Sequence, residues 1–275
     1  MPITYSVIVN SIDAQKLNRL KCNLERCLRY TSWELIHIPD AKGMCEGYNR
    51  GIQLSSGEYL IFCHDGIEFI ADDISKPLAY GFKNSDVFGV MGTRLLIGHN
   101  FELSGLPNTI GMHVISEQDG SFTLLYVGIE GPLMYGIQGI DGAVIGCNRN
   151  VAESLGWDEI NFKGWHCYDV DFSYRAFRAG FNVAITGLLP IIHHTKSTFS
   201  DPDVLLAAKV LRQKHPLLET CAFDKSDVKW ISNMKRGFES LDSVMTFLHE
   251  NYSAIIMDNA KVRADTAGLK IKLFF

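Results

Sequence analysis

Strand patterns and helix patterns alternate along the first 90 residues. Tyr5–Val9 is a short β-branched run, and leucines between positions 17 and 28 recur at helical spacing. A second strand pattern at 34–38 precedes a helical stripe at 45–52 and the continuous apolar run 59–63. Such an apolar run is typical of a strand that is buried on both faces of a parallel sheet. The alternation predicts βαβ units and therefore an α/β fold.

The pattern changes in the second part of the chain. Residues 94–140 are rich in glycine and have no sustained helical period, which predicts hairpins and loops. A strand pattern returns at 143–147 and a helix pattern at 170–179. From Asp201 onward the pattern is helical only.

Chain length agrees with one large domain and a smaller addition. A chain of 275 residues can form an α/β domain of about 200 residues with an appendage. We predict that residues 1–200 form this domain, with halves 1–92 and 93–200, and that residues 201–275 form a helical C-terminal appendage.

Composition narrows the classes of function. Hydrophobic residues make up 47% and charged residues 21%, so we expect a packed core. The net charge of −5 argues against a nucleic-acid partner. The first residues resemble no signal peptide, and no apolar stretch has the roughly 18 to 20 residues that span a bilayer. Seven scattered cysteines without CxxC spacing fit a reducing compartment. We therefore expect a cytoplasmic protein, with peripheral attachment at the inner membrane face as an alternative.

Asp65 is the first candidate site residue. It follows the apolar run 59–63 after a single histidine. Ligands of open α/β sheets bind beyond the carboxyl ends of the strands, so Asp65 is placed to bind a divalent metal ion or a ribose. Mg²⁺ prefers one or two carboxylates together with phosphate oxygens of a substrate. The alternative is a simple turn, because Asp65-Gly66 is a common turn pair.

Asp169 and Asp171 form the second candidate group, at the beginning of a predicted helix. Carboxylates there are stabilised by the helix dipole, so a purely structural role is the alternative to a catalytic one. Residues two apart on a helix point about 200° away from each other, so one acid can face a cleft while the other pairs elsewhere. Asp171 lies four residues before Arg175, which predicts an ion pair on the helix surface.

His193 and His194 follow an apolar pair and form the third group. Imidazole binds transition ions such as Mn²⁺. Adjacent strand residues face opposite sides of a sheet, so at most one of the two histidines can point at a given metal. A structural role is the alternative for both.

These groups occur in an order that resembles glycosyltransferase family 2, the GT-A fold. Segment 40–68, DAKGMCEGYNRGIQLSSGEYLIFCHDGIE, is similar to the family's nucleotide-binding half, which ends in an Asp-x-Asp metal motif. Residues 140–159 resemble its acceptor-side segment, and 168–171 followed by Arg175 resembles its Glu-Asp-x-Asp block. The likeness covers roughly residues 3–200 and is strongest to the bacterial "glycosyltransferase-like" branch. It implies a Rossmann-like, mixed, mainly parallel sheet flanked by helices.

The resemblance also implies a function and a set of site residues. The chain is expected to transfer a sugar, with inversion, from a nucleotide-diphospho-sugar to a hydroxyl of a glycan, a lipid-linked molecule or a protein in bacterial glycan or glycoconjugate synthesis. A UDP-sugar is the expected donor, and Mn²⁺ or Mg²⁺ is the expected cofactor. The implied residues are Asp169 as catalytic base, Asp40, Asn49 and Asp65 for the donor, Asp65, His64 and His193 for the metal, and Asp141, Trp157, Asp158 and Trp165 on the acceptor side.

The sequence departs from the family pattern at several charged positions. His64 and Gly66 flank Asp65 where the motif has acids, Tyr168 replaces a Glu, and Tyr48 replaces an Arg. Metal dependence is therefore open, and a non-catalytic relative that binds nucleotide sugars is the alternative function. A sugar-phosphate nucleotidyltransferase is disfavoured, because no glycine-rich phosphate loop follows the first strand.

The C-terminal segment 269–275 alternates apolar and cationic residues, and it is expected to contact a second subunit, a membrane surface or the protein itself.

Overall fold

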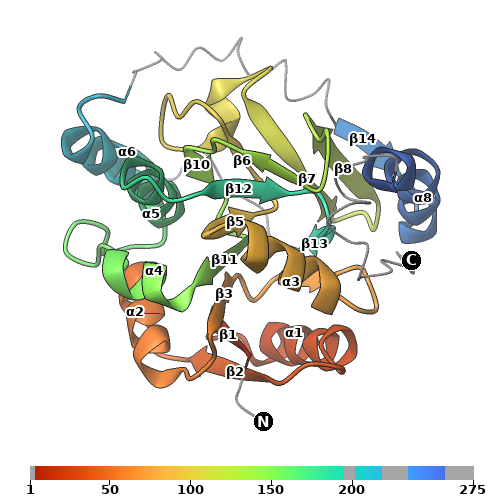
Figure 1. Cartoon of the computed structure of the whole chain (residues 1–275), viewed down its shortest axis with the longest axis horizontal. Coiled ribbons are helices and arrows are strands. Elements are labelled where there is room, and N and C mark those ends of the chain that lie inside the picture. Colours follow the sequence, from red (N-terminus) through yellow and green to blue (C-terminus); the bar gives the residue numbers. More distant parts are fainter. Residues whose placement is uncertain (1–3, 195–201, 219–234, 258–275) are drawn as a thin grey trace.

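A seven-stranded mixed sheet is the centre of the structure, a computed structural model that describes residues 4–194, 202–218 and 235–257 (Figure 1). The strand order is β2-β1-β3-β11-β5-β12-β9. Strands β2, β1, β3, β5 and β12 run in one direction, and β11 and β9 run in the other. The predicted mainly parallel sheet is therefore confirmed. The strands are β1 (Tyr5–Asn10), β2 (Trp33–Ile38), β3 (Tyr59–Cys63), β5 (Val87–Gly89), β9 (Leu133–Tyr135), β11 (Val144–Asn148) and β12 (Val183–Thr186).

A second sheet is built largely from the glycine-rich middle of the chain. Its order is β10-β6-β7-β13-β4, and β8 pairs with β7 to form the hairpin that the sequence predicted. A short 3₁₀ helix, η1 (Phe101–Ser104), precedes this hairpin. The strands are β4 (Ile67–Phe69), β6 (Met91–Thr93), β7 (Thr109–Ser116), β8 (Phe122–Val127), β10 (Gly139–Ile140) and β13 (Ile191–His193).

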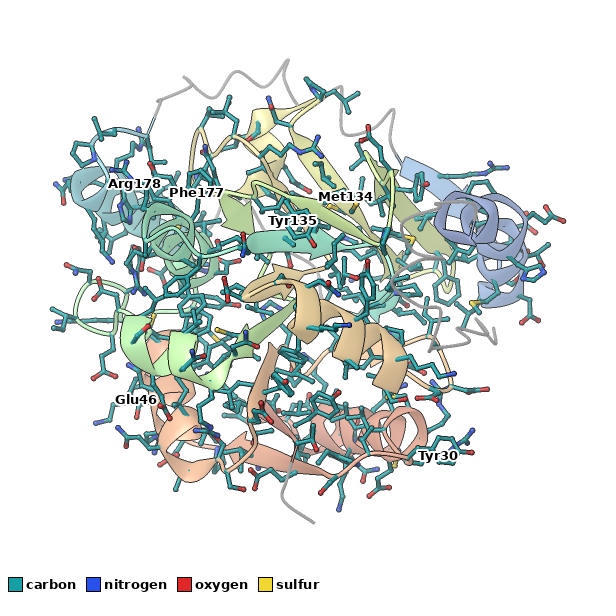
Figure 2. All side chains as sticks on the ribbon, viewed as in Figure 1. Tyr30, Glu46, Met134, Tyr135, Phe177 and Arg178 are labelled. Atoms are coloured by element: carbon teal, nitrogen blue, oxygen red, sulfur yellow. The ribbon has the colours of Figure 1, made fainter. Side chains whose placement is uncertain are left out.

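Helices cover both faces of the first sheet. Helices α1 (Ala14–Cys27) and α3 (Ser75–Asn84) pack on one face, and α2 (Met44–Leu54), α4 (Arg149–Leu155) and α5 (Tyr168–Arg178) pack on the other. The leucine stripe of α1 is buried as its spacing predicts, with Leu20 and Leu24 inaccessible to solvent. Side chains fill the space between the layers, whereas Tyr30, just after α1, lies exposed at the outer edge (Figure 2).

Helix α2 lies unusually close to β1 because it contains glycines on the facing side. A Cβ atom on Gly51 would stand 2.2 Å from Cγ2 of Ile8, which is fully buried in β1. A Cβ atom on Gly47 would stand 2.2 Å from Oδ1 of Asn10. The close approach of this helix to the strand therefore depends on the absence of side chains at both positions.

The C-terminal segment contributes both helices and a strand. The expected helices are present as α6 (Pro202–Lys214) and α8 (Leu241–Met257), and β14 (Lys235–Phe238) pairs antiparallel with β8. The sequence pattern predicted a purely helical segment, but the segment also contains the strand β14. The strand escaped detection because its sequence, KRGF, has a single large apolar residue and no alternation. Segment 269–275 lies outside the described residues, and no described helix is both long and apolar enough to cross a bilayer.

A buried carboxylate fastens α6 to α5. Asp171 is 1% exposed, and its two oxygens accept hydrogen bonds from Arg175 Nε at 2.8 Å, Lys214 Nζ at 2.6 Å and His215 Nε2 at 2.8 Å. The predicted pair with Arg175 is present, but it is buried rather than on the helix surface. Lys214 also lies 2.5 Å from Asp158 and so joins a third segment to this network.

The network changes the acidity of both carboxyl groups. Burial alone would raise the pKa of Asp171, but hydrogen bonds from His215 and Lys214 and the charge of Arg175 outweigh it and hold the pKa below its ordinary value. Burial is likewise outweighed at Asp158, where hydrogen bonds from Lys214 and Asn161 lower the pKa to about 2. The ionised forms are therefore stabilised by folding.

We predict that Gly51→Ala destabilises the protein, because Ile8 or the whole of α2 must move to admit the methyl group. The expected loss is about 1 to 3 kcal/mol of unfolding free energy, typical of overpacking. Urea denaturation measures it. Gly164→Ala is the matched control, because no heavy atom lies within 4 Å of its added Cβ, and its loss should be several times smaller. Equal losses for both variants would show that the contact between α2 and β1 is not tight.

We also predict that Asp171→Asn costs about 3 kcal/mol of stability, because it leaves buried cationic partners without their counter-charge. Folding lowers the pKa of Asp171, so its contribution is complete above the unfolded carboxyl pKa of about 3.9 and is lost as the pH falls through the lower folded value. The wild type and the variant should therefore differ less in stability in strong acid. Glu153→Gln is the control, because its pair with Arg149 is 54% exposed on the glutamate side and should contribute little.

Candidate functional site

Several of the predicted site residues meet at one edge of the first sheet. Strands β1, β2 and β3 are parallel, so the residues that follow them, Ser11, Asp40 and His64, lie on the same side. Strand β11 runs the opposite way and begins with Val144 beside Cys63, and the His64 backbone N–H donates to the carbonyl of Ala143 at 3.1 Å. The sheet therefore brings 141–143 to the edge where ligands of α/β folds bind.

Asp65 lies two residues beyond the end of β3, as predicted. Its Oδ2 accepts a hydrogen bond from Ser11 Oγ at 2.7 Å, and its Oδ1 lies 4.0 Å from Lys16 Nζ. The Asp65 side chain is 20% exposed and that of Lys16 is 42% exposed, so both can be reached from solvent. The sequence reasoning missed Lys16. A signal existed, because the first turn of a helix that follows a parallel strand begins at the same edge of the sheet.

His64 connects β3 to two distant segments. Its Nε2 lies 2.6 Å from the hydroxyl oxygen of Tyr168, and its Nδ1 lies 3.3 Å from Nε2 of His193. Burial and the neighbouring His193 lower the pKa of His64 to about 4, so the ring is neutral at ordinary pH. Both ring nitrogens of His64 are engaged within the protein, which leaves neither for a metal ion in this arrangement.

The two adjacent histidines point in different directions, as strand geometry requires. His193 faces His64, and burial lowers the pKa of His193. His194 instead reaches Glu68, with 3.4 Å between Nε2 and Oε2, and its backbone N–H donates to the carbonyl of Gly66 at 2.7 Å. Of the pair, His193 belongs to the site.

Asp169, in the first turn of α5, lies next to the loop 141–143. Its Oδ2 accepts from the backbone N–H of Gly142 at 2.8 Å, and its Oδ1 accepts from that of Val170 at 2.9 Å. Burial and the charge of Asp141 raise the pKa of Asp169 to about 7. A carboxyl group with a pKa near the ambient pH is suited to general base catalysis.

Strained backbone precedes this acid. Cys167, the residue before α5, has φ 61° and ψ 1°, the left-handed conformation that is uncommon for a residue other than glycine. Such outliers are concentrated at functional sites, where the surrounding structure holds them in place. Here the chain turns into α5 at Cys167, and Tyr168 and Asp169 both lie beside Gly142. A Cβ atom added to Gly142 would stand 2.1 Å from the Tyr168 hydroxyl and 3.1 Å from Asp169 Oδ2.

The two other predicted donor residues have protein partners. Asp40 is largely exposed, and Arg50 holds it at 2.8 Å and lowers its pKa. The side-chain amide of Asn49 makes two hydrogen bonds to the backbone of Trp157. Its Nδ2 donates to the Trp157 carbonyl, and its Oδ1 accepts from the Trp157 N–H, both at 2.9 Å. Asn49 also donates to Glu159, so it fastens α2 to the segment that follows α4.

The predicted acceptor-side residues separate into different environments. Trp157 is 3% exposed and stacks on Phe172 with ring centroids 4.1 Å apart, so it is a core residue here. Asp158 is paired with Lys214, away from Asp169 in the network that holds α6. Asp141 lies at the edge with Asp169, and Trp165 is 49% exposed in the loop before α5. Of the four residues, Asp141 and Trp165 keep a geometry in which an acceptor could touch them.

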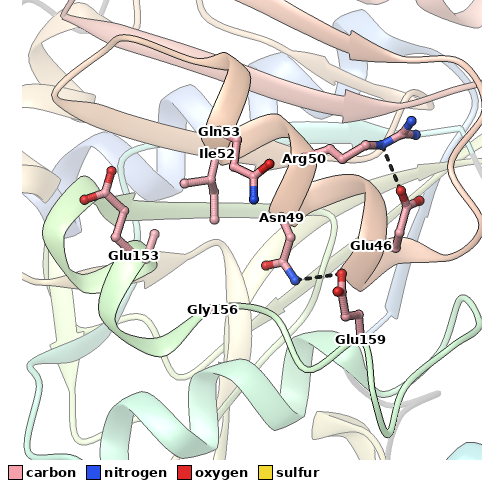
Figure 3. A pocket seen from close by; sticks show the side chains of 9 residues that line it. Glu46, Asn49, Arg50, Ile52, Gln53, Glu153, Gly156 and Glu159 are labelled. Carbon is pink, nitrogen blue, oxygen red and sulfur yellow. Dashed lines mark hydrogen bonds and ion pairs between the residues drawn. The ribbon is translucent and has the colours of Figure 1, made fainter.

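A cavity of about 400 Å³ lies elsewhere, between α2 and α4 (Figure 3). Glu46, Asn49, Arg50, Gln53, Glu153 and Glu159 contribute to its lining. None of Asp65, His64, Asp169 and His193 lines it. It is therefore separate from the edge where the candidate catalytic groups meet.

The side chains at the edge do not form a complete metal cage. In the described ranges, no group of three His, Cys, Asp or Glu side chains is arranged to hold an ion. Asp65 remains as a carboxylate ligand and His193 as a nitrogen ligand, while His64 is occupied. Mg²⁺ usually takes one or two protein carboxylates and completes its shell with water and substrate phosphate oxygens, and Asp65 can supply one such carboxylate.

Comparisons with known proteins bear on the family and the fold of the chain. The family model described as "Glycosyltransferase like family" matches residues 6–208. Among solved structures, GalNAc-T7 with UDP, GalNAc and Mn²⁺ aligns with TM-score 0.51 at 12% identity, over 93% of this chain and 59% of that one. S. aureus TarS 1-349 with UDP aligns with TM-score 0.44 at 12% identity, over 98% and 76%.

A third structure, A197 from STIV, aligns with TM-score 0.42 at 10% identity, over 70% of this chain and 87% of that one. No curated protein gives a significant sequence match. The chain spans 59% of the length of the GalNAc-T7 chain, and the likeness between them is one of fold. Since the family model covers most of the sequence and the sheet has the expected topology, the chain belongs to the glycosyltransferase-like family and has the GT-A fold.

Proposed function

We propose that this protein is a glycosyltransferase that moves a sugar from a UDP-sugar to an acceptor hydroxyl, with inversion at the anomeric carbon. The observation that carries the proposal is the partly buried Asp169, whose pKa is raised to about 7 at the sheet edge that also presents Asp65. The family membership supports the reaction class. The solved structure of GalNAc-T7, which contains UDP, GalNAc and Mn²⁺, supports the choice of donor. The proposed acceptor is a glycan, lipid-linked molecule or protein of bacterial glycan or glycoconjugate synthesis.

The proposed step begins when the acceptor hydroxyl attacks the anomeric carbon from the face opposite the diphosphate. The hydroxyl oxygen forms the new glycosidic bond, its proton passes to Asp169, and the bond between sugar and diphosphate breaks. The backbone N–H groups of Gly142 and Val170 hold the Asp169 carboxylate in place for this transfer. A positioned base of this kind contributes roughly 10² to 10⁴-fold to the rate.

The leaving diphosphate needs positive charge. Lys16 Nζ lies 4.0 Å from Asp65 Oδ1, and this ammonium group can approach a phosphate bound beside Asp65. A divalent cation would be held by Asp65, His193 and the diphosphate, and it would supply Lewis acidity to the leaving group. The alternative function, a binding protein without catalysis, is suggested by His64 and Gly66, which stand where the family's metal motif has acids. It predicts donor binding without turnover.

We predict that Asp169→Asn lowers turnover at least 10²-fold, because the amide cannot accept the proton. Donor affinity should stay within about twofold, since the amide keeps the size of the side chain. The wild-type rate should rise with pH through about 7, as the raised pKa of Asp169 requires, because the base acts in its ionised form. The turnover of the variant and the pH dependence of the wild-type rate are both measured as sugar transfer or donor hydrolysis from UDP-sugars. Retention of a tenth or more of the turnover would remove Asp169 from the role of base. Glu153→Gln, a surface change on α4, should leave turnover unchanged.

We predict that Lys16→Met weakens UDP binding roughly tenfold, which corresponds to about 1.4 kcal/mol, with little effect on uridine, because only UDP carries the diphosphate. Isothermal titration in low salt with EDTA measures both affinities without a contribution from metal. Lys21→Met is the control on the same helix, because Lys21 is 56% exposed and pairs with Glu25. If UDP affinity is the same in Lys16→Met and wild type, Lys16 does not contact the diphosphate.

A further inference from the structure

Helix α6 buries one face and leaves adjacent leucines exposed on another. Its buried residues are Val204, Ala208 and Leu211. On the outer side, Leu205 is 60% exposed and Leu206 is 61% exposed, and the helix lies at the margin of the molecule (Figure 1). A single exposed leucine is ordinary, whereas apolar side chains gathered on one surface mark a place of contact with a partner or a membrane.

Positive charge lies on the same face of this helix. Leu205, Lys209 and Arg212 are spaced i, i+4 and i+7, so they fall within a sector of about 60° around the axis, and all three are exposed. The only acidic residue of α6, Asp203, lies about 160° from Leu205 around the axis. The outer face of α6 is therefore both apolar and cationic, although the whole chain has a net charge of −5.

The loop between α4 and α5 continues this surface. The ammonium of Lys214, at the end of α6, lies 2.5 Å from Asp158 and 5.4 Å from the ring centroid of Phe162. These two contacts hold the loop against α6 on both sides of Ile160, which is 79% exposed. The neighbouring acid Glu159 instead lines the cavity beside α2 and accepts from Asn49 (Figure 3).

Further along, the same loop exposes a cation and an aromatic ring. Lys163 is exposed, and Trp165 is 49% exposed. Tryptophan is favoured where an apolar phase meets water, because its ring is apolar and its N–H is polar. We call the combined surface the α6 face, and define it by Ile160, Trp165, Leu205, Leu206, Lys209 and Arg212.

The mixture of leucine and cation indicates which partner the α6 face fits. The centre of a protein interface is usually depleted of charged residues, lysine above all. A lipid surface accepts both kinds of side chain at once, because leucine and tryptophan enter the acyl boundary while lysine and arginine extend to the headgroups. Anionic headgroups add attraction for each cation near the surface.

We propose that the α6 face docks on an anionic lipid bilayer. The helix lies flat on the surface and does not cross it, with Leu205 and Leu206 in the boundary between headgroups and acyl chains. A free helix of this length is only marginally stable in water, but packing against the domain already folds α6. Docking therefore has no folding step to complete, which reduces its entropic cost.

The docked orientation bears on the acceptor. Asp169 follows Trp165 by four residues, so the loop of the α6 face leads directly into the proposed base. Among the proposed acceptors, this placement favours a lipid-linked molecule, an assignment that rests on the proposed function. The docking itself rests only on the α6 face.

Cosedimentation with vesicles, without donor or metal, tests the docking. The wild type should bind vesicles of equal parts phosphatidylcholine and phosphatidylglycerol at least roughly tenfold more tightly than pure phosphatidylcholine, and high salt should weaken the binding. The double variant Leu205→Ser, Leu206→Ser should lose roughly tenfold or more, because apolar insertion is removed. Its control is Leu54→Ser, Leu106→Ser, which changes leucines of similar exposure on other elements.

A second pair of variants tests the charges. Lys209→Gln with Arg212→Gln should weaken binding to anionic vesicles roughly tenfold and leave binding to phosphatidylcholine unchanged. Lys21→Gln with Arg29→Gln, an exposed pair at α1, is the control and should leave both unchanged. All the substituted side chains are exposed, so the melting temperatures should stay near that of the wild type.

A wild type that stays in solution with anionic vesicles overturns the docking. Vesicle binding that both α6 variants retain in full also overturns it, because the contact then lies elsewhere. A wild-type dimer that dissociates in Leu205→Ser, Leu206→Ser, without vesicle binding, assigns the α6 face to a second copy of the chain instead. A protein that docks but transfers no sugar sinks the proposed function and leaves the docking intact.

Discussion

Pairing between β3 and the antiparallel strand β11 is the constraint on which the site depends. The first three parallel strands can carry Ser11, Asp40 and Asp65 to one edge without it, but they do not contribute the proposed base, Asp169. Because Val144 lies beside Cys63, the loop before β11 is held against the end of β3. That loop supplies the N–H of Gly142 that orients Asp169. The proposed donor-side and base-side groups are thus joined by one register of hydrogen bonds.

Surroundings, rather than residue type, give the two acids of α5 different roles. Asp169 has backbone N–H donors and an anionic neighbour, so burial dominates and its pKa rises. Asp171 has cationic and imidazole donors, so its pKa falls although it is more deeply buried. One turn of helix therefore holds a proton acceptor and a permanent anion. The first suits chemistry near neutral pH, and the second holds neighbouring segments together.

Local pattern was enough to predict the central sheet and the position of Asp65 just beyond a strand end. It was enough because strand ends in a parallel sheet share an edge, whatever else the chain does. It could not show that His64 and Tyr168, which are 104 residues apart, share a proton, since that contact depends on packing. Trp157 illustrates the same limit. Its motif suggested an acceptor surface, but stacking on Phe172 places it in the core.

The family match ends before Lys214, which holds the buried Asp171. The matched region stops at residue 208, inside α6, yet Lys214 and His215 hydrogen-bond to Asp171 from beyond it. Lys214 also binds Asp158 in the segment that leads from α4 toward the loop with Trp165. A fragment cut at the family boundary would keep the buried anion and lose two of its partners.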